Sequence, residues 1–199
     1  MQILNCRLAL YIVVLLSFLL ESCEKSKHEP QKTRTLMVYL AGDNNLSTFM
    51  QKNINDMMSA WNEDFNGNIV VYFDANNAVP ELFTFKVKGN KVIKQTIKEY
   101  EEMNSMDPEV LKMVLTEMKK KYPSDSYGLI LGSHASGWKP VDDKSRATFR
   151  GPVLTRSFGL DGSMEMDTRK MAEAIPFGND QLEFILFDAC LMSSVEVLY

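Results

Sequence analysis

Two side chains stand out as a pair that would do covalent chemistry, namely His134 and Cys190. The sequence has two histidines and three cysteines, and the others (His28, Cys6 and Cys23) lie near the N-terminus. A cysteine attacks as its thiolate and needs a nearby base, most often a histidine that is distant in sequence. The two residues lie 56 positions apart, and the pair predicts nucleophilic catalysis. The alternative is a buried spectator thiol and an unrelated loop imidazole.

Asp188 adds a carboxylate beside the cysteine. If Asp188 and Cys190 share one strand, their side chains face the same way, because side chains alternate along a strand. A carboxylate next to a nucleophile would bind a cationic substrate side chain, and a guanidinium pairs well with it. The alternative is that Asp188 caps the next helix or pairs with an internal arginine.

The elements that must position these residues follow from the hydrophobic pattern. Four short apolar runs do not alternate with polar residues, which is typical of strands buried on both faces of a parallel sheet. Helical periodicity and capping residues predict helices between them, and Gly89-Asn90 predicts a hairpin. The predicted strands are 36–40, 69–73, 127–131 and 184–187, the helices 46–61, 107–118 and one from Asp167 or Thr168 to Ile175, and the hairpin 82–97. Residues 139–166 show no clear period and are interpreted as a long loop.

In an open α/β sheet, ligands bind beyond the carboxyl ends of the parallel strands. The residues that follow the four predicted strands are few, and they predict that His134 and Cys190 meet at one edge of the sheet. These residues are Gly42, Asp43, Asn44, Asp74, Ser133, His134, Asp188, Ala189 and Cys190.

The N-terminus has the pattern of an exported protein. The apolar run 8–20 is shorter than the ~20 residues of a membrane-spanning helix and matches a secretory signal. The following Leu20-Glu21-Ser22-Cys23 resembles a bacterial lipobox, in which Cys23 is acylated; cleavage near Ser22 is the alternative. We therefore divide the chain into a signal peptide (1–23), a polar tether (24–34) and a folded part (35–199). The expected location is the bacterial cell envelope, either membrane-anchored or secreted.

The charge balance excludes one class of partner. The net charge is −4, and the composition is 45% hydrophobic and 24% charged. Without a basic footprint, nucleic acid is not an expected partner.

Three segments together resemble the clostripain family of cysteine peptidases: Met37-Val-Tyr-Leu-Ala-Gly-Asp-Asn-Asn-Leu46, Leu129-Ile-Leu-Gly-Ser-His-Ala-Ser-Gly-Trp138 and Phe187-Asp-Ala-Cys-Leu-Met-Ser-Ser-Val-Glu196. The resemblance implies a caspase-like α/β/α sandwich with a mostly parallel sheet, and cleavage after Arg or Lys. It implies that His134 is the general base, Cys190 the nucleophile and Asp188 the acidic floor of the specificity pocket. The oxyanion would be held by the N–H groups of Cys190 and Ala135, although the family usually has glycine where this chain has Ala135.

The resemblance also implies a zymogen that cuts itself in the loop 139–157. Arg146 is the expected site, with Arg150 the second choice. Some family members need calcium, and Asp161, Ser163, Glu165 and Asp167 place oxygen groups at alternate positions. The glycine and the final acidic residue of an EF-hand loop are absent, so calcium rests on the resemblance and the sequence itself requires no metal.

Family members continue well beyond the catalytic cysteine. We therefore expect residues 35–199 to be the N-terminal part of a truncated peptidase domain, inactive alone and completed by the missing C-terminal part. The partners would be that part, peptide substrates with Arg or Lys, and a membrane reached through the lipid anchor. A catalytically inactive lipoprotein that acts as a binding module is the main alternative. A caspase-type enzyme that prefers acidic residues is the other, and Asp188 disfavours it.

Overall fold

The computed structural model describes residues 33–62, 64–137, 157–178 and 181–193. Helices separate groups of strands along this length, as the hydrophobic pattern predicts. The elements are β1 (Arg34–Gly42), α2 (Ser47–Ala60), β2 (Gly67–Ala75), β3 (Glu81–Lys88), β4 (Lys91–Glu99), α3 (Pro108–Lys121), β5 (Ser126–Gly132), β6 (Ala135–Gly137), β7 (Ser157–Asp161), β8 (Met164–Asp167), α4 (Thr168–Ala174) and β9 (Leu182–Asp188).

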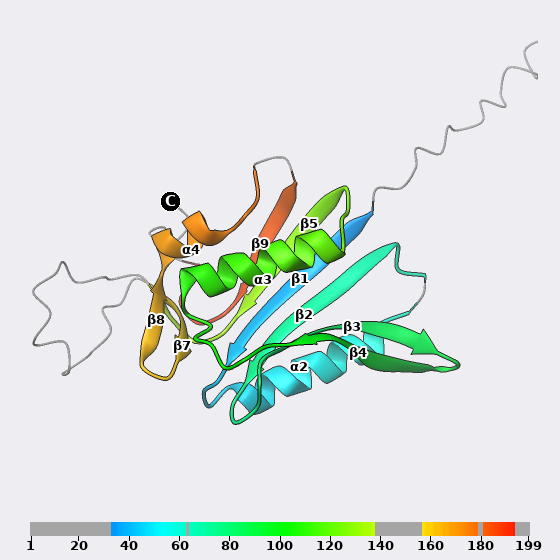
Figure 1. Cartoon of the computed structure of the whole chain (residues 1–199), viewed down its shortest axis with the longest axis horizontal. Helices are drawn as coiled ribbons and strands as arrows, with labels where there is room; N and C mark the ends of the chain where they lie inside the picture. The colour runs from blue at the N-terminus through cyan, green and yellow to red at the C-terminus, as the bar shows by residue number, and fades with distance from the viewer. Residues whose placement is uncertain (1–32, 63, 138–156, 179–180, 194–199) are drawn as a thin grey trace, which may run out of the picture. The chain divides into compact units, whose positions relative to one another are not determined.

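The main sheet has six strands in the order β4-β3-β2-β1-β5-β9 (Figure 1). β1 lies in the interior of the sheet and pairs in parallel with both β2 and β5, and β9 pairs in parallel with β5. β3 and β4 form the predicted hairpin and are antiparallel. The prediction of a mostly parallel α/β sheet is therefore confirmed.

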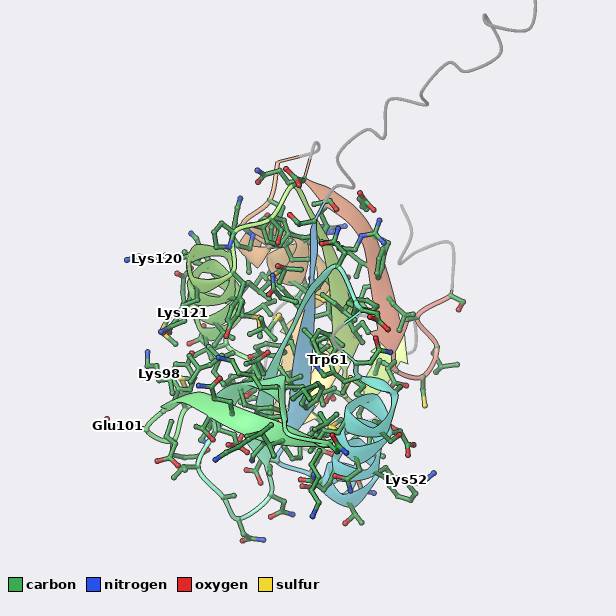
Figure 2. The ribbon with its side chains drawn as sticks, turned by 90° about the vertical axis from the view of Figure 1, so that its right-hand side faces the viewer. Lys52, Trp61, Lys98, Glu101, Lys120 and Lys121 are labelled. Atoms are coloured by element: carbon green, nitrogen blue, oxygen red, sulfur yellow. The ribbon has the colours of Figure 1, made fainter. Side chains whose placement is uncertain are left out.

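Helices cover both faces of this sheet. α2 packs on one face, where Met50 and Ile54 contact Leu40 and its neighbours in one apolar core. α3 packs on the other face, where Leu115 and the rest of its apolar stripe join Tyr39 in a second core. Because successive β1 residues enter opposite cores, the β1 sequence is apolar without alternation. Figure 2 shows α2 and α3 on opposite sides of the sheet, with Lys52, Lys120 and Lys121 pointing outward.

The predicted capping and turn residues act as expected. The Asp107 side chain accepts a hydrogen bond from the Glu109 N–H at 2.9 Å, and Pro108 is the first residue of α3. Asp167, one of the two predicted caps, accepts from the N–H groups of Arg169 and Lys170 at the start of α4. Gly89 turns the β3–β4 hairpin with φ +62°, a conformation that glycine adopts without strain.

The prediction of a long loop over 139–166 is wrong for residues 157–166. Residues 157–161 and 164–167 form β7 and β8, an antiparallel hairpin that joins β6 in a small second sheet. Two strands this short show too few alternations to be recognised, and Gly159 and Gly162 interrupt the pattern. Residues 138–156 lie outside the described residues.

The prediction that the run 184–187 is buried on both faces is also wrong. Phe184, Ile185 and Leu186 of β9 are exposed, because in the described part of the chain β9 pairs on one side only, with β5. Phe49 of α2 is exposed as well. Within the described ranges, no helix is both long and apolar enough to cross a membrane.

Candidate active site

The pairing of β5 with β9 sets the frame of the candidate site. Gly132, the last residue of β5, is the register partner of Asp188, the last residue of β9. His134 follows two residues after Gly132, and Cys190 two residues after Asp188. The prediction that His134 and Cys190 lie at the same edge of the sheet is therefore confirmed.

The backbone at His134 is fixed by β7. Its carbonyl accepts a hydrogen bond from the Gly159 N–H at 2.7 Å. Gly159 has φ +82°, and a Cβ there would lie 1.7 Å from the Met106 Sδ, so glycine is required at this contact. The histidine loop is thus tied to a strand that the sequence pattern did not predict.

The imidazole of His134 contacts the segment that follows β1. Its Nε2 lies 2.6 Å from the Asn45 Oδ1, which is hydrogen-bonding distance. Sequence reasoning named Gly42, Asp43 and Asn44 after this strand and did not single out Asn45. The signal was present, because Asn45 follows the carboxyl end of β1 and belongs to the first of the three family-like segments.

Cys190 is a free and exposed thiol in the turn after β9. The alternative of a buried spectator thiol is therefore wrong. The argument that strand alternation aligns Cys190 with Asp188 also fails, because β9 ends at Asp188. Leu191, directly after the cysteine, has φ +58°, which is uncommon for a residue other than glycine. The cysteine is thus presented by a tight turn.

Asp188 is exposed, and its partner comes from α2. The Asn53 Nδ2 donates to its Oδ2 at 3.1 Å. The partner is a neutral amide, whereas the alternative interpretation from the sequence expected an internal arginine. A cation brought to this carboxylate would replace an uncharged donor with a charged one, and a guanidinium could bind both carboxylate oxygens at once.

Ala135 opens β6, and its N–H does not point at β7. Ala135 pairs with Phe158, and the flanking hydrogen bond runs from the Gly159 N–H to the His134 carbonyl. In an antiparallel ladder this pattern marks Ala135 and Phe158 as a non-hydrogen-bonded pair. The Ala135 N–H therefore points away from β7, on the opposite side of the β6 strand.

Asp74 also lies at the carboxyl end of a parallel strand, as the second-last residue of β2, but it belongs to a buried polar network. Ser105 joins the network with three groups: its Oγ donates to the Asp74 Oδ2 at 2.5 Å, its N–H donates to the Asp161 Oδ2 at 2.6 Å, and its carbonyl accepts from the Tyr39 hydroxyl at 2.8 Å. Burial raises the pKa of Asp74 from 3.8 to about 7, with the Asp161 charge adding to the rise. The network connects β1, β2, β7 and the segment before α3, and burial makes the Asp74 carboxyl inaccessible to a substrate.

The four alternating oxygen groups do not converge as a calcium site. Asp161 is buried against the Ser105 N–H, and Asp167 caps α4. Among the residues that the structure describes, no three His, Cys, Asp or Glu side chains come together as a metal site.

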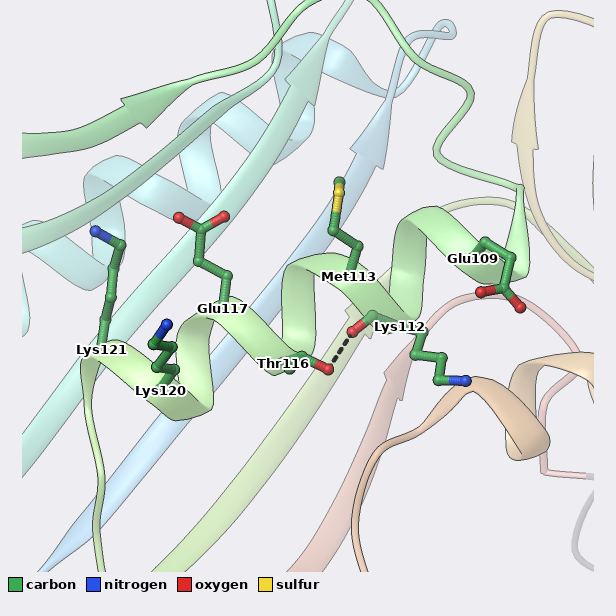
Figure 3. A pocket seen from close by; sticks show the side chains of 7 residues that line it. All are labelled: Glu109, Lys112, Met113, Thr116, Glu117, Lys120 and Lys121. Carbon is green, nitrogen blue, oxygen red and sulfur yellow. Dashed lines mark hydrogen bonds between the residues drawn. The ribbon is translucent and has the colours of Figure 1, made fainter.

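A shallow hollow on the outer face of α3 holds no candidate residue. All seven residues that line it belong to this helix, and Figure 3 shows their side chains along its solvent side, with the Thr116 Oγ1 donating to the Lys112 carbonyl at 2.6 Å. A surface built from a single helix does not bring together the groups that catalysis needs. Its lining residues are Glu109, Lys112, Met113, Thr116, Glu117, Lys120 and Lys121.

Three predicted sites lie outside the described residues. These are the expected cleavage sites Arg146 and Arg150 and the lipidation site Cys23.

Comparison with known proteins agrees with the fold and the three sequence segments. Residues 38–199 match the family model of the clostripain family. Clostripain from Hathewaya histolytica is 28% identical in an alignment 199 residues long, which covers 88% of this chain and 37% of that protein.

Two solved structures are similar over most of this chain. A secreted C11 cysteine protease from Bacteroides thetaiotaomicron, in complex with an irreversible peptide inhibitor, has 34% identity and a TM-score of 0.69, with 84% of this chain and 45% of that chain covered. An inactive zymogen C11 protease from Parabacteroides distasonis has 32% identity and a TM-score of 0.66, with 86% and 46% covered. This chain spans less than half the length of these relatives.

Proposed function

Because this chain belongs to the clostripain family of cysteine peptidases, we propose that it forms part of a cysteine endopeptidase with Cys190 as nucleophile and His134 as general base. The observation that carries the proposal is the parallel pairing of β5 with β9. It brings the two strand ends that precede His134 and Cys190 to adjacent positions at the edge where α/β sheets bind ligands. The exposure of the Cys190 thiol supports the same role.

The proposed reaction has two stages. His134 takes the thiol proton, the Cys190 Sγ bonds to the scissile carbonyl carbon, and the carbonyl oxygen becomes an oxyanion. The N–H groups of Cys190 and Ala135 stabilise that oxyanion, and the direction of the Ala135 N–H supports this role. His134 then gives the proton to the amine nitrogen as the scissile C–N bond breaks, which leaves Cys190 acylated. Water, deprotonated by His134, attacks the thioester carbon, the C–S bond breaks, and His134 returns the proton to the Cys190 sulfur.

We assign Asp188 to recognition of Arg or Lys before the cleaved bond. It is an exposed carboxylate at the end of β9, two residues before the nucleophile, and its hydrogen-bond donor, Asn53, is uncharged. A substrate guanidinium or ammonium would replace Asn53 as its partner. An acidic substrate side chain would be repelled at the same position.

The test uses the protein expressed from its full open reading frame without residues 1–23. Fluorogenic peptides with Arg, Lys or Asp before the reporter group are assayed against the wild type and Cys190→Ala. We expect cleavage after Arg and Lys that disappears in Cys190→Ala and in His134→Ala. A folded protein that cleaves none of these peptides would favour the inactive lipoprotein binding module instead.

We propose activation by self-cleavage after Arg146, with Arg150 as the second choice. An inactive zymogen is known for the relative from Parabacteroides distasonis, which supports a precursor form in this family. Mass spectrometry of the active protein should show a cut after Arg146 that is lost in Cys190→Ala. An intact segment 139–157 in a fully active enzyme would contradict the proposal.

Export and calcium dependence are proposed on different grounds. The apolar run 8–20 and the relative described as secreted support export to the cell envelope, with Cys23 as the lipidated residue. Cys23→Ser should abolish membrane retention and leave the protein soluble outside the cytoplasm. Calcium dependence remains a prediction from the family, which a comparison of activity with calcium and with a chelator tests directly.

A further inference from the structure

We propose that Asn45 is a positioning residue that holds the imidazole of His134 through its Nε2, leaving Nδ1 as the nitrogen that exchanges the proton with Cys190. The inference rests on the proposed function and names a third side chain for it. The starting observation is the 2.6 Å contact between the His134 Nε2 and the Asn45 Oδ1. It joins residues 89 positions apart that come from the ends of adjacent parallel strands.

Backbone groups of two residues, Ala41 and Leu160, fix the loops of Asn45 and His134. The Ala41 carbonyl accepts from the Asn44 Nδ2 at 3.0 Å and from the Ser133 Oγ at 2.8 Å. The Leu160 carbonyl accepts from the Asn44 Nδ2 at 2.8 Å, while the Leu160 N–H donates to the Ser133 Oγ at 3.2 Å. Asn44 precedes Asn45, and Ser133 precedes His134. The same two residues, Ala41 and Leu160, therefore fix the backbone before Asn45 and before His134.

Because both loops are held by the same two residues, the fold itself sets the distance between Asn45 and His134. The Asn44 Oδ1 also accepts the Leu46 N–H at 2.9 Å, which fixes the backbone on both sides of Asn45. On the other loop, the Gly159 N–H holds the His134 carbonyl. Asn45 itself is exposed, in contrast to the buried Ser133, so the fold does not depend on burying its side chain.

The chemistry of the contact determines which ring nitrogen is available. An amide oxygen can only accept, so a contact through the Oδ1 requires the proton on Nε2. In the neutral imidazole Nδ1 then carries the lone pair, as a base for the thiol requires. A catalytic histidine is commonly held in this way by a third group that fixes its tautomer and orientation. Asn45 would do so without adding a charge.

Three variants of Asn45 separate positioning from structure. Asn45→Leu keeps the approximate volume and removes the acceptor, Asn45→Ala removes both, and Asn45→Asp keeps an acceptor oxygen. We expect kcat to fall about 10- to 100-fold in the Leu and Ala variants with KM and Tm unchanged, because a misplaced catalytic group costs rate and not binding. Asn45→Asp should recover most of the lost rate. The matched control is Asn55→Ala, an exposed asparagine on α2 that accepts from Gln51, and it should leave kcat unchanged.

A second readout does not depend on peptidase activity. Nitrogen-15 NMR of the ring, assigned by its loss in His134→Ala, should show the Nε2–H tautomer in the wild type and a mixed population in Asn45→Leu. If the wild type cleaves no peptide, the proposed function fails while this measurement still decides the inference. An unchanged kcat in Asn45→Leu, no rescue by Asn45→Asp, or an Nδ1–H tautomer in the wild type would each overturn it.

Discussion

Two carboxylates at the carboxyl ends of parallel strands of the same sheet differ in their exposure to solvent. Asp74 is the second-last residue of β2, is 1% exposed, and is bound to Ser105 within a network of buried tyrosines. Asp188 is the last residue of β9, is exposed, and contacts a neutral amide. The difference teaches that a position at the carboxyl edge of the sheet does not by itself make a carboxylate part of the active site. The β2 end is sealed by Ser105 and β7, whereas the β9 end is open.

The same contrast holds for the apolar side chains of the two regions. Leu40 on β1 is 2% exposed, and Leu186 on β9 is 48% exposed. Both lie on the α2 face of the sheet, because Leu186 pairs with Ile130, which pairs with Val38 of the α2-side core. Two leucines in equivalent apolar runs therefore differ in whether a neighbour covers them.

The largest expected effect comes from truncating these two leucines. Leu40→Ala should lower the free energy of unfolding by about 2–5 kcal/mol, because it opens a cavity in a packed core. Leu186→Ala should cost less than about 1 kcal/mol, because little buried area is lost. Urea unfolding of both variants measures the difference. An equal loss of unfolding free energy in the two variants would mean that Leu186 is covered in solution, and the contrast between β1 and β9 would not hold.

The second effect is the pH dependence that Asp74 gives to stability. Its pKa is raised from 3.8 to about 7 in the folded protein, so between these values the folded state binds more protons than the unfolded chain. Stability from this group is therefore complete below about pH 4 and is lost as the pH rises through about 7. The full shift corresponds to a free energy on the order of 4 kcal/mol.

Asp74→Asn should remove this dependence, since the amide keeps an acceptor for the Ser105 Oγ and carries no charge. Thermal unfolding at pH 8 should show the variant to be more stable than the wild type, and at pH 4 the two should be alike. Asp161, whose pKa is also raised by burial, contributes a residual slope of the same sign. A variant less stable than the wild type at pH 8 would contradict the raised pKa of Asp74.

The exposed carboxylate should affect catalysis and leave stability unchanged. Asp188→Asn should reduce kcat/KM for Arg and Lys peptides about 10- to 150-fold, the range of one hydrogen bond to a charged group. Unfolding should be unaffected, because the side chain is exposed. Asn53→Ala is the matched control, since it removes the partner and keeps the charge, and it should change kcat/KM little. Equal activity of Asp188→Asn on Arg peptides would remove Asp188 from recognition.

The sequence predicted the strands of the sheet because buried parallel strands leave uninterrupted apolar runs. It predicted the common edge of His134 and Cys190 because the ends of those strands are marked by polar residues. It did not reveal β7, whose short pattern is broken by Gly159, although β7 holds the backbone of His134. The position of Asn45 after β1 was visible in the sequence, but its contact with His134 was not, because no periodicity reports a contact between residues so far apart.

The smallest expected effect compares two turns with left-handed residues. Asn77 follows β2 with φ 60°, and Leu191 follows β9 with φ 58°. Asparagine tolerates this conformation, whereas a leucine is strained there by about 1 kcal/mol. Leu191→Gly should raise the free energy of unfolding by less than about 1 kcal/mol, because the added entropy of the unfolded chain offsets part of the relief. Asn77→Gly should show a smaller gain.

The kcat of the glycine variants shows whether the strained backbone at Leu191 contributes to catalysis. Left-handed residues other than glycine persist where the surrounding structure holds them, and such residues cluster at active sites. Leu191 lies beside the proposed nucleophile, so Leu191→Gly should lose kcat while it gains stability, because a looser turn no longer fixes the thiol and the Cys190 N–H. Asn77→Gly, at the sealed end of the sheet, should leave kcat unchanged. A gain in stability at Leu191 without any loss of kcat would show that the strained turn serves the packing of Met192, which is buried, and not the presentation of the cysteine.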